Sequence, residues 1–360
     1  MKICVVLPCN IYTAPYYKRY EQMITNSYTE FDFICWNRAL INEESEGNII
    51  NYNLQDKVMS GKPFKLLKYI GFANFVRKKL REKKYDKVII LGSYAGIMAQ
   101  LSYFLKNEYP GKYWLDIRDY TFENIKLYSK GMKTAINYSY QTAISSPGYR
   151  EFLPQHDYVI AHNIDHINIK KALDLKKEQK RNGPIRISFI GLIRYFEENK
   201  KLLSVLGNDS RFKLQYYGMN VEKVEQYCKN NNINNVDFHG RFLPTETASF
   251  YEKTDIINNL YGNEKIALTT ALSNKLYFSA GLKIPILVSP NTYMEKATVT
   301  KGFGFKVDYD DQRIADNLYN WYLDLEEGNI LPEYDEFFNK VKEEDQAFIN
   351  SFKMFIESKL

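Results

Sequence analysis

Between Ile185 and Ser289 the chain repeats one pattern, in which a short apolar run ends in glycine, asparagine, arginine or lysine. The pattern occurs at residues 185–194 (IRISFIGLIR), 236–242 (VDFHGRF), 255–261 (DIINNLY) and 274–289 (NKLYFSAGLKIPILVS). Such runs are typical of buried parallel strands, which present ligand-binding groups at their carboxyl ends. The pattern therefore predicts an α/β domain with a binding site along one edge of its sheet.

The alternation of strand-like and helix-like segments extends over the whole chain. We expect strands at 2–8, 31–36, 87–92, 113–117, 142–145 and 158–161, and again at 185–190, 212–217, 236–239, 255–259, 285–289 and 304–307. Amphipathic stretches such as 64–83 and 221–230 lie between them, which indicates βαβ units and mostly parallel sheets. The predicted fold class is therefore α/β, with two doubly wound domains.

A charged segment separates the two halves. Residues 170–184 (KKALDLKKEQKRNGP) have no large apolar side chain after Leu175 and end in an Asn-Gly-Pro turn signal. We expect a first domain over 1–170, a linker over 171–184, a second domain over 185–335, and a C-terminal helix over 336–360 that packs back toward the first domain. A chain of 360 residues is long enough for two domains.

Charge and composition exclude several classes of protein. No apolar run reaches about 18 residues, the length of a membrane-spanning helix. The net charge is +6, with basic clusters at 77–84 (RKKLREKK) and 176–181 (KKEQKR). Solvated helix faces explain such clusters, and contact with an anionic membrane surface is the alternative. Signatures of nucleic-acid-binding modules are absent, and four cysteines without a CxxC pair suit a reduced compartment. We expect a cytoplasmic protein that can associate with the inner face of a membrane.

Glycine and basic residues follow the first strand of the second half. Gly191 would let the backbone approach a phosphate, and Arg194 and Lys200 follow it closely. Positive charge beside a phosphate or diphosphate group stabilises the negative charge that such a group carries or develops. Asn274 and Lys275 open another helix, whose first N–H groups favour an anion. Solvated surface charge is the alternative for Arg194 and Lys200.

These motifs resemble the nucleotide-sugar-binding half of a GT-B glycosyltransferase of family 4, the type found in bacterial capsule, exopolysaccharide and O-antigen biosynthesis. The likeness rests on Gly191 with Arg194, on a helix start at 244–251 (PTETASFY), and on residues 274–277, which are similar to the family's NKLYEY segment. It covers 185–308 closely and 1–170 more loosely. The resemblance implies GT-B architecture: two Rossmann-like domains facing a central cleft, with C-terminal helices.

The resemblance also implies residues on both sides of that cleft. The donor-binding residues would be Gly191, Arg194, Lys200, His239, Gly240, Arg241, Tyr261, Asn263, Thr270, Asn274, Lys275 and Leu276. The acceptor-side residues would be Asn10, Tyr12, Asp116 and Ser146. Arg194 and Lys275 would stabilise the departing diphosphate. Asp119, in the segment DIRD, would be the carboxylate that positions or deprotonates an acceptor hydroxyl. A structural Asp–Arg pair is the alternative for that segment.

The implied reaction moves a sugar from a UDP- or GDP-linked donor to a growing, lipid-linked bacterial surface glycan, with retention and without a metal or cofactor. The partners would be the nucleotide-sugar, a glycan or lipid-linked glycan acceptor and a membrane surface, with no nucleic acid. His162 and His166 lack a third ligand of fitting spacing, so no metal site is expected.

One departure from the family pattern supports an alternative. The family's paired glutamates would fall near Thr270 and Phe278, and neither residue is acidic. Asn263, Glu264, Thr269 or Thr270 are the alternatives that could take the place of the first glutamate. A non-catalytic GT-B subunit, which binds a glycan or supports an active transferase, is therefore the second hypothesis. A GT-B epimerase or phosphorylase is the third, although no further motif favours either.

Overall fold

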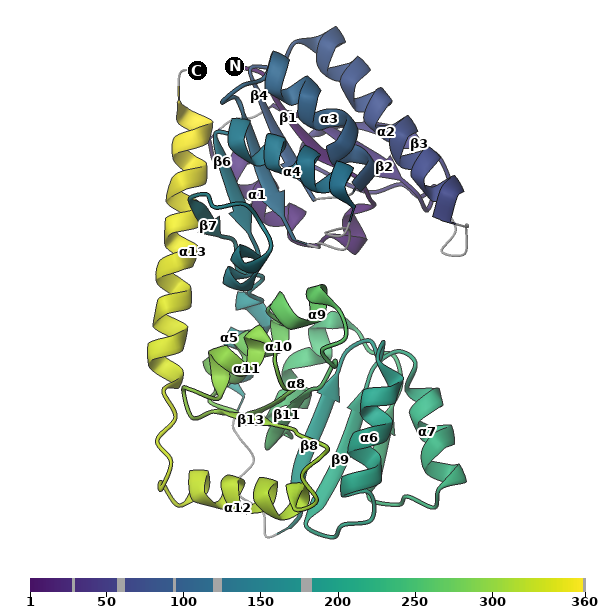
Figure 1. Ribbon diagram of the computed structural model, residues 1–360, viewed down its shortest axis with the longest axis vertical. Coiled ribbons are helices and arrows are strands. Elements are labelled where there is room, and N and C mark those ends of the chain that lie inside the picture. Colours follow the sequence, from purple (N-terminus) through teal and green to yellow (C-terminus); the bar gives the residue numbers. More distant parts are fainter. Residues whose placement is uncertain (28–29, 57–61, 93–94, 119–124, 176–182, 359–360) are drawn as a thin grey trace. The chain divides into compact units, whose positions relative to one another are not determined.

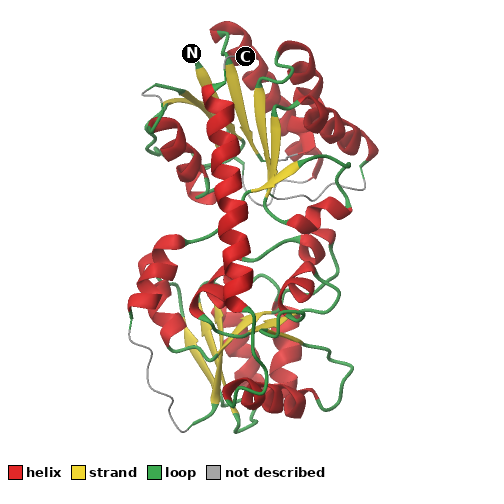
Figure 2. Ribbon diagram, turned by 90° about the vertical axis from the view of Figure 1, so that its left-hand side faces the viewer, coloured by secondary structure: helices red, strands yellow, loops and turns green. Residues whose placement is uncertain are grey.

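The computed structural model describes residues 1–27, 30–56, 62–92, 95–118, 125–175 and 183–358 (Figure 1). The chain divides into two compact units. Unit 1 comprises Met1–His162 and Glu343–Leu360, and unit 2 comprises Asn163–Lys342. In both units a parallel sheet lies between helices (Figure 2).

The sheet of unit 1 has seven strands in the order β3-β2-β1-β4-β5-β6-β7, and every pair is parallel. Its strands β1, β4 and β5 are buried along their whole length, which suits the central strands of a sheet covered on both faces. The bounds are β1 Ile3–Leu7, β2 Asp32–Asn37, β3 Asn48–Asn53, β4 Lys87–Leu91, β5 Tyr113–Ile117, β6 Gln141–Ile144 and β7 Tyr158–Ile160.

Helices cover both faces of this sheet. On one face α2, α3 and α4 lie side by side (Figure 1). On the other face, α1 and the end of α13 pack an aromatic core in which Phe348 and Phe352 meet Tyr20 and Trp114 edge to face. The bounds are η1 Ile11–Thr13, α1 Tyr17–Thr25, α2 Lys62–Lys83, α3 Ala95–Glu108, α4 Lys126–Tyr138, η2 Pro147–Glu151 and α13 Tyr334–Glu357.

The sheet of unit 2 has six strands in the order β10-β9-β8-β11-β12-β13, again all parallel. The strand order therefore reverses between β8 and β11. The strands are β8 Ile185–Ile190, β9 Phe212–Tyr217, β10 Val236–His239, β11 Ile256–Asn259, β12 Ile286–Val288 and β13 Gly304–Lys306. The helices are α5 His166–Asp174, α6 Phe196–Leu206, α7 Val221–Asn230, η3 Pro244–Glu246, α8 Thr247–Glu252, α9 Ile266–Thr270, α10 Asn274–Leu282, α11 Tyr293–Thr298 and α12 Ile314–Glu326.

The predicted fold class is confirmed, since both halves are doubly wound parallel α/β units. All twelve expected strands are present, and the sequence analysis missed only β3 among the described strands. The division into units falls at His162, before the expected linker at 171–184. The reason is that α5 packs with unit 2, where Ile169 and Ala172 enter the core. No helix in the described ranges is long and apolar enough to cross a membrane.

Candidate functional site

The topology of unit 2 places a candidate site outside the carboxyl ends of β8 and β11. In open α/β sheets, ligands bind where the strand order reverses, because the loops after the two neighbouring strands run to opposite faces and leave a crevice. The loop after β8 begins with Gly191, and the loop after β11 contains Tyr261 and Gly262. Three of the predicted donor-binding residues, Gly191, Arg194 and Tyr261, therefore lie at the reversal point.

Gly191 and Gly218 determine how closely a ligand can approach the backbone at the carboxyl edge of the sheet. Both have positive φ angles, +128° and +134°. A Cβ atom on Gly218 would lie 1.9 Å from the carbonyl oxygen of Gly191, so the loop after β9 packs directly on the loop after β8. A Cβ on Gly191 would meet nothing within 4 Å. The backbone at Gly191 is thus supported from one side and open on the other, as close approach of a phosphate requires.

Tyr261 connects the loop after β8 with the start of α10. Its ring packs edge-on against Phe189 and Tyr195, with ring centroids 6.0 and 5.6 Å apart. Burial raises the pKa of Tyr261 to about 12, although the Ser273 hydroxyl and the Arg194 charge lie close enough to oppose that rise. Arg194 and Ser273, the residue that precedes α10, therefore both lie close to the hydroxyl of Tyr261.

Arg194 is the basic residue most available to a ligand here. Its side chain is exposed, and within the described parts of the chain it has no ion-pair partner. Lys200, in contrast, is 3.0 Å from a carboxylate oxygen of Glu197 and lies over the ring of Phe196. Lys200 is therefore engaged on its own helix, and of Arg194 and Lys200 only Arg194 can meet a diphosphate without breaking an ion pair.

The side chain of Lys275 is buried inside unit 2 and is not exposed at the carboxyl edge of the sheet. Its Nζ donates to the carbonyl of Asn258 at 2.9 Å and sits 3.3 Å from the ring centroid of Phe189. Burial lowers the pKa of Lys275 well below its ordinary value. In this arrangement the amine ties α10 to β11 and β8, and the contact with a diphosphate expected from the sequence stays a prediction.

The start of α10 is capped by its own chain. The Ser273 hydroxyl accepts from the N–H of Lys275 at 3.3 Å, and the Ser273 carbonyl accepts from Leu276 N–H at 3.0 Å. Leu276 is fully buried, so only its backbone is near the edge. Asn274 is exposed, and its Oδ1 accepts from Asn163 Nδ2 at 2.8 Å. An anion at this helix start would reach Asn274 most directly.

The other predicted donor-binding residues are spread along the same edge. His239 ends β10 and stacks on Tyr217 with ring centroids 4.6 Å apart. Gly240 and Arg241 are exposed beside it. Asn263 is exposed after β11, and its Nδ2 donates to the carbonyl of Pro290 at 3.0 Å. Because β9 separates β10 from β8, His239 and its neighbours lie two strands from Arg194.

The positions expected for the paired glutamates belong to the core. Thr270 is buried, and its hydroxyl donates to the carbonyl of Ile266 at 2.6 Å. Phe278 is also buried and stacks on Tyr251 with ring centroids 4.2 Å apart. Neither side chain is placed to bind the hydroxyls of a ribose or sugar.

The acceptor-side residues at the first strand of unit 1 are largely committed to internal hydrogen bonds. Asn10 is buried, and its amide donates to Asn37 and Glu43 at 3.0 and 2.8 Å. The carboxylate of Glu43 also accepts from the N–H groups of Ile11 and Tyr12 at 3.0 and 2.9 Å. Only the side chain of Tyr12, which is exposed, is presented to solvent.

The DIRD segment forms a buried ion pair. Asp116 is completely buried, accepts from the Tyr20 hydroxyl at 2.5 Å, and is 3.1 Å from Arg118 Nε. Burial raises the pKa of Asp116, although Arg118 and Tyr20 oppose the rise. This geometry corresponds to the structural alternative for the segment, because the carboxylate does not reach the surface. Asp119 lies outside the described residues.

Ser146 is also fully buried, and its hydroxyl caps η2 by accepting from Gly148 N–H at 3.1 Å.

The two histidines considered as metal ligands belong to different units and have different surroundings. His162 precedes α5, and its Nε2 pairs with Glu344 at 2.8 Å, whereas His166 is the exposed first residue of α5. Across the described ranges, no three His, Cys, Asp or Glu side chains gather as a metal site would require. The four cysteines are buried, and no disulfide joins them.

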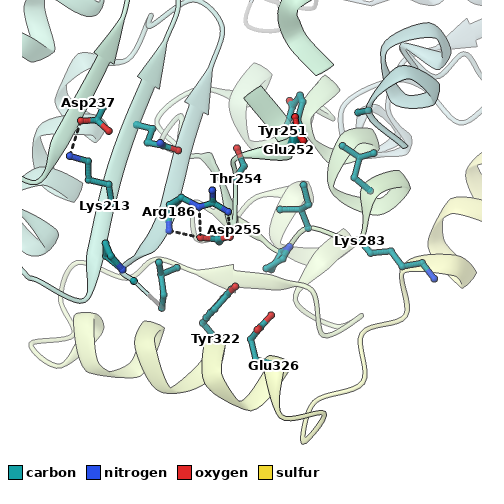
Figure 3. A pocket seen from close by; sticks show the side chains of 18 of the residues that line it. Arg186, Lys213, Asp237, Tyr251, Glu252, Thr254, Asp255, Lys283, Tyr322 and Glu326 are labelled. Carbon is teal, nitrogen blue, oxygen red and sulfur yellow. Dashed lines mark hydrogen bonds and ion pairs between the residues drawn. The ribbon is translucent and has the colours of Figure 1, made fainter. Parts of the chain in front are cut away.

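A cavity of about 1120 Å³ lies at the opposite edge of the second sheet (Figure 3). It is lined by residues at the amino ends of the strands, including Arg186, Lys213, Asp237 and Asp255. These charges neutralise one another, since Arg186 pairs with Asp255 at 2.9 Å and Lys213 with Asp237 at 2.7 Å. The cavity is thus distinct from the candidate site at the carboxyl edge.

Several residues at the candidate site were not predicted from the sequence. Gly218 supports Gly191, Ser273 caps α10, and the Ser289 hydroxyl accepts from Gly262 N–H at 3.0 Å. Gly218 follows β9 as Gly191 follows β8, and this repetition is the signal that could have identified it. Ser273 directly precedes the predicted helix start and is a common capping residue.

Comparison with known proteins supports the fold directly. No family model and no curated protein sequence matches the chain. Sucrose-phosphate synthase from Thermosynechococcus elongatus has a similar structure, with a TM-score of 0.63, 9% identity, and coverage of 98% of this chain and 100% of that one. Anabaena HepE in complex with UDP gives 0.63 at 9% identity, covering 98% and 99%. UDP-GlcNAc 2-epimerase from Neisseria meningitidis, bound to UDP-GlcNAc, gives 0.56 at 13% identity, covering 98% and 99%. The chain therefore has the two-domain GT-B fold.

Proposed function

We propose that the protein is a glycosyltransferase that takes a sugar from a nucleotide donor bound at the carboxyl edge of the second sheet. The observation that carries the proposal is the pairing of an open glycine, Gly191, with an exposed cation that has no described ion-pair partner, Arg194, where the strand order reverses. A diphosphate needs close backbone approach and a counter-charge, and these two residues supply both.

In this proposal Arg194 performs the main electrostatic role. As the bond between sugar and diphosphate breaks, negative charge grows on the leaving diphosphate, and a fixed guanidinium beside it stabilises the transition state more than the ground state. Asn274, at the start of α10, would add a hydrogen bond and the favourable end of the helix dipole. Lys200 would have to leave Glu197 to contribute, so we assign it no contact.

Lys275 would be a positioning residue. Its buried amine joins the Asn258 carbonyl to the rings of Phe189 and Tyr261. These partners lie on β11, on β8 and just after β11, so Lys275 fixes the start of α10 against the two strands that flank the reversal point. Its replacement is expected to disturb the position of Asn274 rather than to remove a charge from the diphosphate.

The finer features of the reaction rest on the family resemblance. We propose a UDP- or GDP-linked donor, a lipid-linked bacterial surface glycan as acceptor, retention at the transferred carbon, and no metal or cofactor. Two proteins of similar structure hold UDP and UDP-GlcNAc, which supports testing uridine nucleotides first. Asp119 remains the proposed acceptor-side carboxylate, since Asp116 is buried.

One observation favours a second function, that of a nucleotide-binding subunit without turnover. At the positions of the family's two glutamates, Thr270 and Phe278 are buried and have no carboxylate to offer. A donor would then be held by its diphosphate, while the sugar and ribose lacked their usual partners. Such a protein would bind nucleoside diphosphates and fail to consume the donor.

Turnover of a panel of nucleotide-sugars by the full chain tests the proposal. Release of nucleoside diphosphate should be detectable with one donor, and Arg194→Ala should lower kcat/KM at least about tenfold, because a lost charge-assisted contact costs about 1.4 kcal/mol or more. Lys200→Ala is the matched control and should retain wild-type turnover. Nucleotide binding without any turnover would favour the subunit, and equal turnover by wild type and Arg194→Ala would refute the assignment of Arg194.

A further inference from the structure

The cavity at the amino edge of the second sheet is a concave site that the proposed reaction does not use. We call it the amino-edge cavity, because its walls include the amino ends of strands and one face of α12 (Figure 3). All of its lining residues belong to unit 2. Its volume of about 1120 Å³ exceeds the roughly 300–1,000 Å³ of ordinary small-molecule pockets, so it has room for a ligand of several rings. Its principal polar residues are Arg186, Lys213, Gln215, Asp237, Glu252 and Asp255.

Most charged groups of the amino-edge cavity are held in compensated pairs. Arg186 Nη2 lies 2.9 Å from Asp255 Oδ1, and Arg186 Nε donates to Asp255 Oδ2 at 2.9 Å. The backbone N–H of Arg186 donates to the same Oδ2 at 2.8 Å. Lys213 Nζ lies 2.7 Å from a carboxylate oxygen of Asp237. Because an ionic ligand would have to break one of these pairs, the cavity favours a neutral ligand.

The cavity also has hydrogen-bonding capacity that the protein itself does not use. Gln215 is 8% exposed, and its Oε1 accepts from the Ser188 hydroxyl at 3.0 Å. Within the described ranges its Nε2 has no acceptor, and the carboxylate of Glu252 has no ion-pair partner. The Asp255 carboxylate has about four acceptor directions, of which Arg186 occupies three. An apolar ligand would leave these groups without partners, whereas a ligand rich in hydroxyls would satisfy them.

Tyrosines of α12 contribute aromatic rings to the wall of the cavity. Tyr319 and Tyr322 both line it and are three residues apart, so they lie on the same side of the helix. In Figure 3 the side chain of Tyr322 points from α12 toward the pair of Arg186 and Asp255. Burial raises the pKa of Tyr322 and the Asp255 charge adds to the rise, although Arg186 opposes it, so the hydroxyl stays protonated. A ring with a hydroxyl at its tip suits a sugar, which has apolar C–H faces and polar edges.

We propose that the amino-edge cavity binds a neutral oligosaccharide, at a site separate from the candidate donor site at the carboxyl edge. The paired charges, the unused hydrogen-bonding groups and the tyrosines together select an uncharged ligand that has hydroxyls and apolar ring faces. An anion such as a nucleotide would meet the carboxylate of Glu252 and would compete with Asp237 and Asp255 for their cations. The inference rests on the proposed function for its purpose, which is to hold the growing glycan on the protein between successive transfers.

Calorimetric titration of the full chain with maltotriose, cellotriose and chitotriose, without any nucleotide, tests the inference. We expect one or more of these trisaccharides to bind, with an affinity that changes little with salt, because a neutral ligand gains nothing from unscreened charge. Trigalacturonate, which is similar in size but carries a carboxylate on every ring, should not bind. Hydrogen exchange should show that the bound trisaccharide protects α12 and the amino ends of β8 and β11.

Gly183→Trp is designed to fill the amino-edge cavity. Gly183 lines it, and a Cβ atom there would meet nothing within 4 Å, so the substitution adds bulk without a backbone clash. The affinity for the trisaccharide should fall at least about tenfold, because the added ring occupies the space of the ligand. Gln215→Leu, which removes one neutral hydrogen-bonding group, should weaken binding about fivefold. Glu222→Trp, at an exposed position of α7, is the matched control and should bind like the wild type.

Melting temperatures and donor turnover separate loss of this site from general damage. Gly183→Trp and Glu222→Trp should keep the wild-type melting temperature, because neither side chain enters the packed core. A chain that binds a trisaccharide but consumes no donor would leave the inference intact and refute only the proposed reaction. Absence of binding by all of the neutral trisaccharides would overturn the inference, as would equal affinity of the wild type and Gly183→Trp. Binding of trigalacturonate that Gly183→Trp abolishes would overturn the assignment to a neutral ligand.

Discussion

Lys87 offers a sharp test of how the end of α13 is held in unit 1. The residue begins β4 and is 1% exposed. Its Nζ donates to the carbonyls of Phe355, Ile356 and Ser358 and to the Ser358 hydroxyl; the distances to Ile356 and Ser358 O are 2.8 and 2.6 Å. These are carbonyls at the end of a helix, which lack partners within the helix itself. Lys87→Met would keep the apolar stem and remove all of these bonds.

The expected cost follows from those contacts. Removing one partner of a buried, charge-assisted hydrogen-bond group costs about 3 kcal/mol, because the acceptors left behind are only partly rehydrated. For a unit of this size, that loss lowers the melting temperature by roughly 6–12 °C. Thermal and urea unfolding of the full chain measure the change, and hydrogen exchange should show faster exchange in the last turns of α13. Lys78→Met, on the exposed face of α2, is the control and should change stability by less than about 0.5 kcal/mol. A Lys87→Met protein with wild-type stability and unchanged exchange in α13 would refute this account of the helix end.

Two further substitutions test other parts of the structure. Burial alone would raise the pKa of Asp32, but hydrogen bonds from Tyr85, Lys83 and Asn48 outweigh it and the pKa is lowered. The stability that this carboxylate contributes is therefore present above its unfolded pKa of about 3.9 and is lost as the pH falls through the lowered folded value. Asp32→Asn should cost about 1–2 kcal/mol at pH 7 and progressively less as the pH falls through the lowered folded pKa, and a difference constant with pH in denaturant titrations would contradict this. Gly218→Ala should destabilise unit 2 by more than about 2 kcal/mol, since its Cβ would lie 1.9 Å from the Gly191 carbonyl oxygen at a positive φ. Gly240→Ala, where a Cβ meets nothing within 4 Å, should be nearly neutral in calorimetry, and equal effects of the two would contradict the packing described.

The strands could be predicted from the sequence because they lie in the middle of covered sheets. Strands such as β4 and β8 are continuous apolar runs, and burial on both faces demands that composition. The strand β3 (NIINYN) escaped because it is an edge strand that is half exposed, so polar residues interrupt its pattern. Gly191 and Gly240 could be predicted as residues at strand ends because the strands that they follow, β8 and β10, could be predicted.

The direction of individual side chains could not be predicted. Lys275 stands at a helix start, where a lysine can meet an anion, yet it turns inward because Phe189, Asn258 and Tyr261 form a pocket for its amine. Those partners come from separate segments of the chain. In the same way Asp116 ends a strand like a site residue, but Tyr20 on α1 covers it from 96 positions away. In both cases segments that are distant in the sequence bury the side chain, and no local sequence motif indicates this burial.

The most direct test of the central claim is calorimetric titration of the full chain with nucleoside diphosphates, beginning with UDP. The account predicts that one of them binds to the wild type, that Arg194→Ala weakens this binding at least about tenfold, and that Lys200→Ala leaves it unchanged. Absence of binding by every nucleoside diphosphate, or equal affinity of the wild type and Arg194→Ala, would contradict a diphosphate site at the carboxyl edge of the second sheet.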